Sequence, residues 1–260
     1  MEKDKINYYS DELNDEFSGI VRDTIRIDGS YRYLHHNPLW HIGAFLTYRV
    51  IMTPVAALYM KLKFKMKIVN RSALLQCRKD AFFLYGNHTQ VPGDGYIPTV
   101  LTFPKKDIVV VNADNVSMPG TRTFMEMIGA YPLPHDREGM VHFMNGLKHY
   151  IGRKKSIVIY PEAHIWPYYI GIRPYSDASF AYPVMYHKPA YSFTVTYQRF
   201  RHSGRPKITV YVDGPLYPKE GVRRKEAQLE LRNRVYEKMM ERSKESTYEY
   251  IKYRKKEEIS

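Results

Sequence analysis

With 260 residues, the chain is long enough to bury one sizeable core, and one domain with a terminal appendage is the economical organisation. Its 40 lysines and arginines exceed its 27 aspartates and glutamates, and the net charge of +13 favours anionic partners such as phospholipid surfaces, nucleotides or acidic carrier proteins. The single cysteine, Cys77, excludes an intramolecular disulfide, fits a reducing compartment and offers no metal site.

Nucleic acid is the competing explanation of this charge. The sequence contains no zinc-finger spacing, no ribonucleoprotein motif and no basic coiled-coil region. Charge without such a motif is weak support for nucleic-acid binding, so we expect no nucleic-acid partner and favour anionic membrane lipids.

The first strongly apolar segment extends from Leu39 to Met60 and follows an acidic, polar leader that does not resemble a signal peptide. The segment has the length of a membrane span, but Arg49 and Pro54 interrupt it. We therefore expect a monotopic, membrane-associating helix or a kinked hairpin on the cytoplasmic face of a membrane. A buried core helix is the alternative.

Lysines alternate with apolar residues over 61–68, a pattern that predicts an edge strand with a cationic face turned outward. Such a face would suit anionic head groups. We expect residues 1–68 to form the leader and membrane-associating segment, and residues 69–260 to form the second domain.

The rest of the chain alternates between strand and helix patterns. Short apolar, β-branched runs predict strands at 81–85, 108–112, 157–160, 192–197 and 208–212. Helical periodicity occurs at 121–128 and 138–151, and a charged helix with a narrow apolar stripe is expected at 222–243. This order predicts an α/β fold with a layered mixed sheet and flanking helices, in which ligand sites lie beyond the strand ends.

The most informative stretch surrounds the end of the first of these strands. Its apolar run leads into Asn87 and His88, and the turn 91–93 then bends the chain before Asp94. We expect Asp94 to hydrogen-bond one imidazole nitrogen of His88 and to leave the other free to accept a proton. No Ser or Cys nucleophile stands beside the pair, so such a base would activate a hydroxyl of the substrate itself. A histidine that merely caps the next helix is the alternative.

Four segments, in order, resemble the sequence blocks of the glycerolipid acyltransferases, the family that includes lysophosphatidic acid acyltransferase. The first block reads Asn-His, four residues, Asp, whereas five residues separate His88 from Asp94 here. Residues 129–137 are similar to the second block, in which a glycine leads through a short strand to an arginine. Residues 156–164 resemble the third block but keep only its Pro-Glu pair and lack its Gly-Thr-Arg. Residues 180–197 resemble the fourth.

This resemblance implies a glycerolipid acyltransferase-like fold and an O-acyltransferase of phospholipid biosynthesis. Such an enzyme moves a fatty acyl group from acyl-CoA or acyl-ACP (acyl carrier protein) to the free hydroxyl of a lysophospholipid, in the first place lysophosphatidic acid, with no bound cofactor or metal. It also implies that His88 is the base and that Asp94 orients it. The implied oxyanion donors are backbone N–H groups of residues 86–89.

The resemblance further implies the substrate contacts. Asn87 accompanies the base, Arg137 would bind the acceptor phosphate, and Glu162 would position the acceptor. Either His164 or Arg173 is the candidate to replace the missing cation of the third block. The five-residue spacing and the lost Gly-Thr-Arg also fit an alternative, a catalytically inactive acyltransferase-like protein that binds lipid surfaces.

Overall fold

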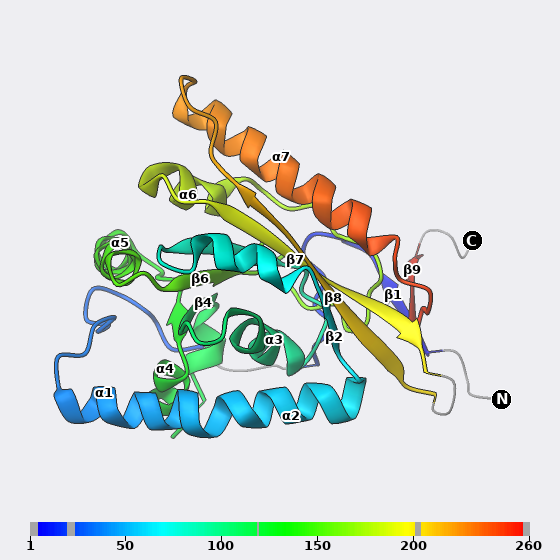
Figure 1. Cartoon of the computed structure of the whole chain (residues 1–260), viewed down its shortest axis with the longest axis horizontal. Coiled ribbons are helices and arrows are strands. Elements are labelled where there is room, and N and C mark those ends of the chain that lie inside the picture. The colour runs from blue at the N-terminus through cyan, green and yellow to red at the C-terminus, as the bar shows by residue number, and fades with distance from the viewer. Residues whose placement is uncertain (1–4, 20–23, 119, 201–203, 257–260) are drawn as a thin grey trace.

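A seven-stranded mixed sheet forms the centre of the computed structural model, which describes residues 5–19, 24–118, 120–200 and 204–256 (Figure 1). The strand order is β2-β8-β7-β3-β6-β4-β5, and all neighbours run parallel except β7 and β8. The strands are β2 (Lys67–Val69), β3 (Phe82–Gly86), β4 (Asp107–Val111), β5 (Ala130–Pro132), β6 (Ser156–Ile159), β7 (Ala190–Arg199) and β8 (Pro206–Leu216). The expected α/β class and all five expected strands are confirmed.

Helices cover both faces of this sheet. The α-helices are α1 (Pro38–Phe45), α2 (Thr53–Phe64), α3 (Gly93–Thr102), α4 (Arg122–Met127), α5 (Arg137–Gly152), α6 (Ala181–Tyr186) and α7 (Arg224–Ser243). Short 3₁₀ segments occur at Arg71–Cys77, Ala113–Val116 and Ala178–Phe180. The structure thus confirms the helices expected at 121–128, 138–151 and 222–243.

Two apolar layers, one on each face of the sheet, form the core. Along β3, Phe83 and Tyr85 enter the layer shared with α5 and α7, whereas Phe82 and Leu84 enter the layer shared with α2 and α3. The alternation follows from the two-residue repeat of a strand. Because both of its faces are covered, β3 is buried along its whole length, which explains why its sequence is continuously apolar.

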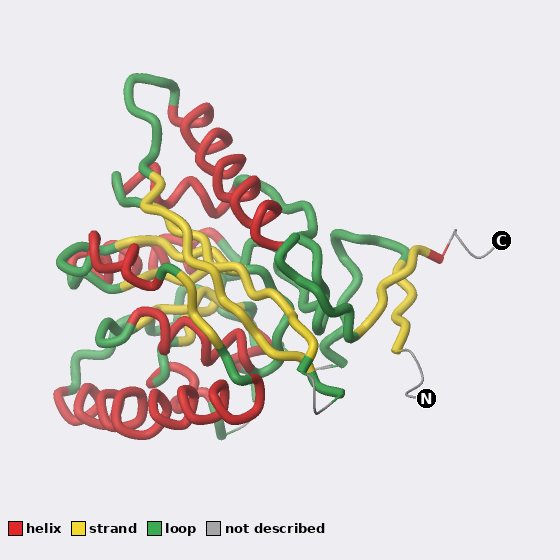
Figure 2. The backbone as a smooth tube through the Cα atoms, turned by 45° about the vertical axis from the view of Figure 1, so that its right-hand side comes forward, coloured by secondary structure: helices red, strands yellow, loops and turns green. Residues whose placement is uncertain are grey.

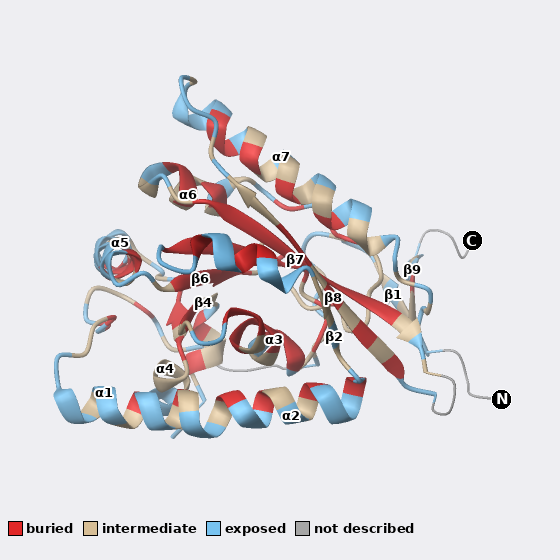
Figure 3. Ribbon diagram, viewed as in Figure 1, coloured by how far each residue is buried: buried red, intermediate tan, exposed pale blue. Residues whose placement is uncertain are grey.

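Residues 38–64 form one continuous helix, in which a π-helical turn over Leu46–Met52 joins α1 to α2. By length and composition the helix is apolar enough to cross or associate with a membrane. Figure 3 shows a pale, exposed face along it, where Leu39 is 75% exposed, Ile42 57% and Phe45 60%. The expected apolar helix is therefore present as a candidate for membrane association. The kinked hairpin is not present, because local π geometry accommodates Pro54 without reversing the chain.

The edge strand expected over 61–68 is mostly wrong. Helix α2 continues to Phe64, and the chain leaves it at Lys65 in a left-handed conformation, so only the last two residues of that range reach β2. Met60 and Phe64, four residues apart, lie on one helical face and are buried in the core, and this packing outweighs the alternating pattern. β2 does lie at the edge of the sheet.

A second, two-stranded sheet joins the two ends of the described chain. β1 (Lys5–Tyr9) runs parallel to β9 (Ile251–Lys255), and Figure 2 shows the pair apart from the main sheet. Residues near the start of the chain also enter the main core, because Ile27 and Tyr31 share a layer with β3. The division into domains at residue 68 remains a prediction.

Candidate active site

The carboxyl end of β3 carries His88, and the neighbouring strand β7 fixes this end of β3. The Asn87 side chain donates to the Val195 carbonyl at 3.0 Å and accepts from the Val195 N–H at 2.8 Å. A Cβ at Gly86 would lie 2.1 Å from the Phe193 ring, so this close approach requires glycine. Asn87 is buried, and it supports the site from behind instead of facing a ligand as we expected.

His88 and Asp94 form the expected pair. Nδ1 of His88 lies 2.7 Å from Oδ2 of Asp94, and the backbone N–H of Gln90 donates to the same oxygen at 2.9 Å. Asp94 lies in the first turn of α3, where the helix dipole favours a negative charge. The His88–Asp94 contact therefore forms even though five residues separate the two, one more than in the family's first block.

The side chains of His88 and Asp94 differ in how far they are exposed to solvent. The Asp94 carboxyl is buried, and burial raises its pKa while the His88 contact opposes that rise. The His88 side chain remains 18% exposed, and among the described residues its Nε2 has no hydrogen-bond partner. The arrangement fixes Nδ1 on the carboxylate and leaves Nε2 available to exchange a proton.

Tyr160 completes the immediate surroundings of the imidazole. Its ring stacks on His88 with centroids 4.6 Å apart, and its hydroxyl donates to the backbone carbonyl of Asp94. Our sequence reasoning missed this residue. A signal was present, because Tyr160 directly follows β6, the parallel neighbour of β3, and parallel strands end at a common edge.

Glu162 and Arg173 form a buried pair behind His88. Glu162 accepts from the backbone N–H groups of His88 and Arg173, each at 3.3 Å, and its Oε2 lies 3.5 Å from the guanidinium. Burial raises the pKa of Glu162, and the Arg173 charge opposes this. Neither side chain is exposed, so the pair fixes the backbone of the histidine and does not present a charge to a ligand as the sequence suggested.

The other two candidate cations lie elsewhere. His164 is partly exposed and approaches Glu16 at 3.4 Å. Arg137 is the first residue of α5 and is exposed, and in the described part of the chain no hydrogen bond or ion pair engages its side chain. Arg137 follows β5, which lies three strands away from β3 in the sheet. At the usual strand spacing, β5 and β3 are roughly 14 Å apart. Arg137 thus shares the sheet edge with His88 without contacting it.

The described residues around His88 were compared with the side chains that metal sites and covalent nucleophiles use. Over the described residues, no group of three His, Cys, Asp or Glu side chains could hold a metal ion. In the same ranges, no hydrogen bond joins His88 to a Ser, Thr or Cys side chain, and Thr89 bonds instead to Tyr197 at 2.8 Å. The described site thus consists of a histidine whose Nδ1 is held by a buried carboxylate.

Comparison with solved structures gives the following similarities. The chain is similar to the crystal structure of the 1-acyl-sn-glycerophosphate (LPA) acyltransferase PlsC from Thermotoga maritima, with a TM-score of 0.49, 14% identity, and coverage of 79% of this chain and 95% of that one. A mitochondrial ATP synthase chain from Euglena gracilis gives a TM-score of 0.17 at 11% identity, with 81% of this chain and 72% of that chain covered. No protein-family model and no curated protein sequence matches.

Proposed function

We propose that the protein is an O-acyltransferase in which His88 is the general base. The observation that carries this proposal is the 2.7 Å contact between His88 Nδ1 and Asp94, which leaves Nε2 unengaged among the described atoms at the edge of the sheet. A general base held in this way suits proton removal from an alcohol brought by the substrate.

The reaction that fits this geometry is direct acyl transfer. Nε2 of His88 takes the proton of the acceptor hydroxyl, and the oxygen attacks the carbonyl carbon of a thioester. The carbon–sulfur bond then breaks, and the imidazolium returns its proton to the leaving sulfur. The products are an ester and a free thiol, and Asp94 stabilises the imidazolium that exists between the two proton transfers.

The substrate class rests on the resemblance of four sequence segments to the glycerolipid acyltransferases. We propose a lysophospholipid acceptor, with lysophosphatidic acid as the first candidate, and acyl-CoA or acyl-ACP as the donor. The net charge of +13 and the apolar helix 38–64 support a protein that acts at the surface of an anionic membrane. We propose that it lies on the cytoplasmic face of that membrane. Arg137 is the proposed phosphate contact, and Arg137→Ala is expected to raise the acceptor KM more than it lowers kcat.

The test is transfer of a labelled acyl group from each donor to a panel of lysophospholipids. His88→Ala is expected to lower turnover by about 10²- to 10⁴-fold, the usual contribution of a general base. His149→Ala, on an exposed part of α5, serves as the matched histidine control and is expected to keep full activity. No transfer by folded wild-type protein would favour the inactive, lipid-binding alternative, and full activity of folded His88→Ala would refute the mechanism.

A further inference from the structure

A second feature lies away from His88, beside the edge strand β5, where residues 31–37 run without regular secondary structure. Alternate side chains of this segment point inward, since Tyr31 and Tyr33 are buried and the Tyr33 hydroxyl donates to the Pro132 carbonyl at 2.9 Å. The intervening residues, Arg32 among them, face outward. The segment therefore covers the edge strand and presents a polar face.

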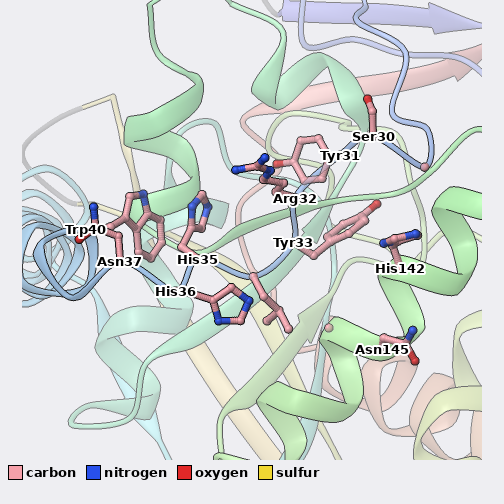
Figure 4. Close-up of a pocket in the computed structure, with 13 residues that line it drawn as sticks. Ser30, Tyr31, Arg32, Tyr33, His35, His36, Asn37, Trp40, His142 and Asn145 are labelled. Atoms are coloured by element: carbon pink, nitrogen blue, oxygen red, sulfur yellow. The ribbon is translucent and has the colours of Figure 1, made fainter.

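Between this face, α5 and the start of α1 lies a hollow of about 780 Å³, within the range of small-molecule sites (Figure 4). In Figure 4, His142 and Asn145 project from α5 on one side, and the stacked rings of His35 and Trp40 stand on the other, 3.8 Å apart. The polar and aromatic side chains of the hollow include Arg32, His35, His36, Trp40, His142 and Asn145. None of the residues of the His88 site lines it.

The lining is rich in donors and contains no acidic side chain. A guanidinium offers five N–H donors, an amide two, and each imidazole at least one in any protonation state. Three carboxylates border the hollow. Glu126 is engaged by Arg122 at 2.9 Å and by His35 at 3.2 Å, and Asp28 accepts from the Ser30 hydroxyl at 2.7 Å. Glu138 lies beside Gly29, at one end of the lining. At the walls away from Gly29, an anion could therefore enter without meeting an uncompensated negative charge.

Positive groups near the hollow also favour binding of an anion. Burial lowers the pKa of His149, and the charges of Arg153, His36 and His41 lower it further. The Arg153 guanidinium thus adds positive potential beside the hollow. This potential would attract an anion that also satisfies the donors.

The position of the hollow identifies the source of the anion. Trp40 belongs both to the wall of the hollow and to α1, whose exposed face carries Leu39, Ile42 and Phe45. If this apolar face enters a bilayer, the hollow lies at the level of the head groups, where lipid phosphates are concentrated. A tryptophan at such a boundary is the usual interfacial residue.

We propose that this hollow binds the phosphate of an anionic phospholipid head group, with Arg32, His36 and His142 as the principal donors. The site is separate from the proposed acyl-transfer site and does not depend on it. It would set the depth and orientation of the protein on the membrane surface.

The test is binding of the full chain to phosphatidylcholine vesicles with and without phosphatidic acid. Arg32→Gln is expected to weaken binding to the phosphatidic acid vesicles by about tenfold, as loss of one charge-assisted hydrogen bond would. Arg224→Gln, at the exposed start of α7, removes the same charge elsewhere and is expected to have a much smaller effect. His142→Ala, on the opposite wall, should weaken binding in the same direction. Equal losses for Arg32→Gln and Arg224→Gln would overturn the proposal.

Trp40 fluorescence provides a second readout, with Trp40→Phe to assign the signal against Trp166, the other tryptophan. Phosphatidic acid vesicles are expected to change the Trp40 signal in wild type and in His88→Ala at the same lipid concentration, whereas Arg32→Gln should need about tenfold more lipid. Inorganic phosphate is expected to compete only weakly. If inorganic phosphate alone saturates the signal while vesicles do not, the hollow is a free-phosphate site and the lipid assignment is wrong.

Discussion

At the scale of single residues, His88 is held from four directions. Its N–H donates to Glu162 at 3.3 Å, its carbonyl accepts from the Trp166 N–H at 3.1 Å, Asp94 binds Nδ1, and Tyr160 stacks on the ring. Side chains fixed by such supporting contacts keep the geometry that catalysis needs. Each contact should therefore affect turnover without abolishing it.

Asp94→Asn is expected to lower kcat by less than the roughly 10²- to 10⁴-fold loss of His88→Ala, because the imidazole remains but its orientation and tautomer are no longer fixed. Tyr160→Phe keeps the stacked ring and should cost less again. Steady-state kinetics on the three variants, with folding checked by circular dichroism, decides the ranking. An unchanged rate for Asp94→Asn would remove the carboxylate from the mechanism.

A further buried carboxyl, that of Asp107, should make stability depend on pH. Asp107, at the start of β4, accepts from the Tyr48 hydroxyl at 3.2 Å and from Ser156. Burial raises its pKa from 3.8 to about 6, so the folded state binds more protons than the unfolded state between these values. The free energy of unfolding should therefore fall as pH rises through this window, by about 3 kcal/mol from this group.

Asp107→Asn should remove this contribution and flatten the pH dependence between pH about 4 and pH about 6. Urea unfolding of both proteins across the window measures the difference, and Glu220→Gln, an exposed carboxylate, is the control. Parallel stability curves for wild type and Asp107→Asn would show that the carboxyl does not titrate differently on folding.

At the scale of elements, the helix 38–64 has one face buried against the protein and one face exposed to solvent. Tyr48, Ala56 and Met60 are buried against the protein, whereas its other face is apolar and exposed. Ile42→Gln with Phe45→Gln should shift the protein from membrane to supernatant, since each buried apolar side chain contributes about 1.5–3 kcal/mol.

The matched control for this shift is Leu229→Gln with Met240→Gln, two exposed apolar residues of α7. Flotation with liposomes measures the partitioning of both variants. Equal partitioning of the two would refute membrane contact through α1. Substitution is a better test than removal of residues 1–60, because that deletion would also remove core residues such as Ile27 and Tyr31.

At the scale of the whole molecule, the two ends of the chain fasten the loop that carries Glu162 and Trp166. The Phe17 N–H donates to Ile165 at 3.1 Å, its ring packs edge-on against Trp166 at 5.3 Å, and the Tyr253 ring stacks on the same indole at 4.8 Å. Since Trp166 bonds the His88 carbonyl, both ends of the described chain support the site.

Phe17→Ala should therefore lower the free energy of unfolding by about 2 kcal/mol through lost aromatic burial, and also reduce turnover. Tyr8→Ala, on the exposed side of β1, should change neither much. Urea unfolding and the acyl-transfer assay provide the two measurements. A destabilised Phe17→Ala protein with normal turnover would show that the loop does not depend on this contact.

Local features could be predicted from the sequence alone. Short apolar, β-branched runs predicted the five strands, and 3.6-residue periodicity predicted the flanking helices and the buried stripe of α7, because backbone type depends on which side chains can face the core. The His88–Asp94 contact was also predictable, since only five residues and a turn separate the two.

Contacts between segments that are distant in the sequence could be seen only in the tertiary structure. Three such arrangements depend on strand order or on a loop crossing. They place Tyr160 beside His88, Glu162 against Arg173, and His36 opposite His142. The run 61–66 became helix because Met60 and Phe64 could be buried together, which the alternating pattern did not reveal. Periodicity records whether a residue faces the core, but it carries no information about which remote residue it meets there.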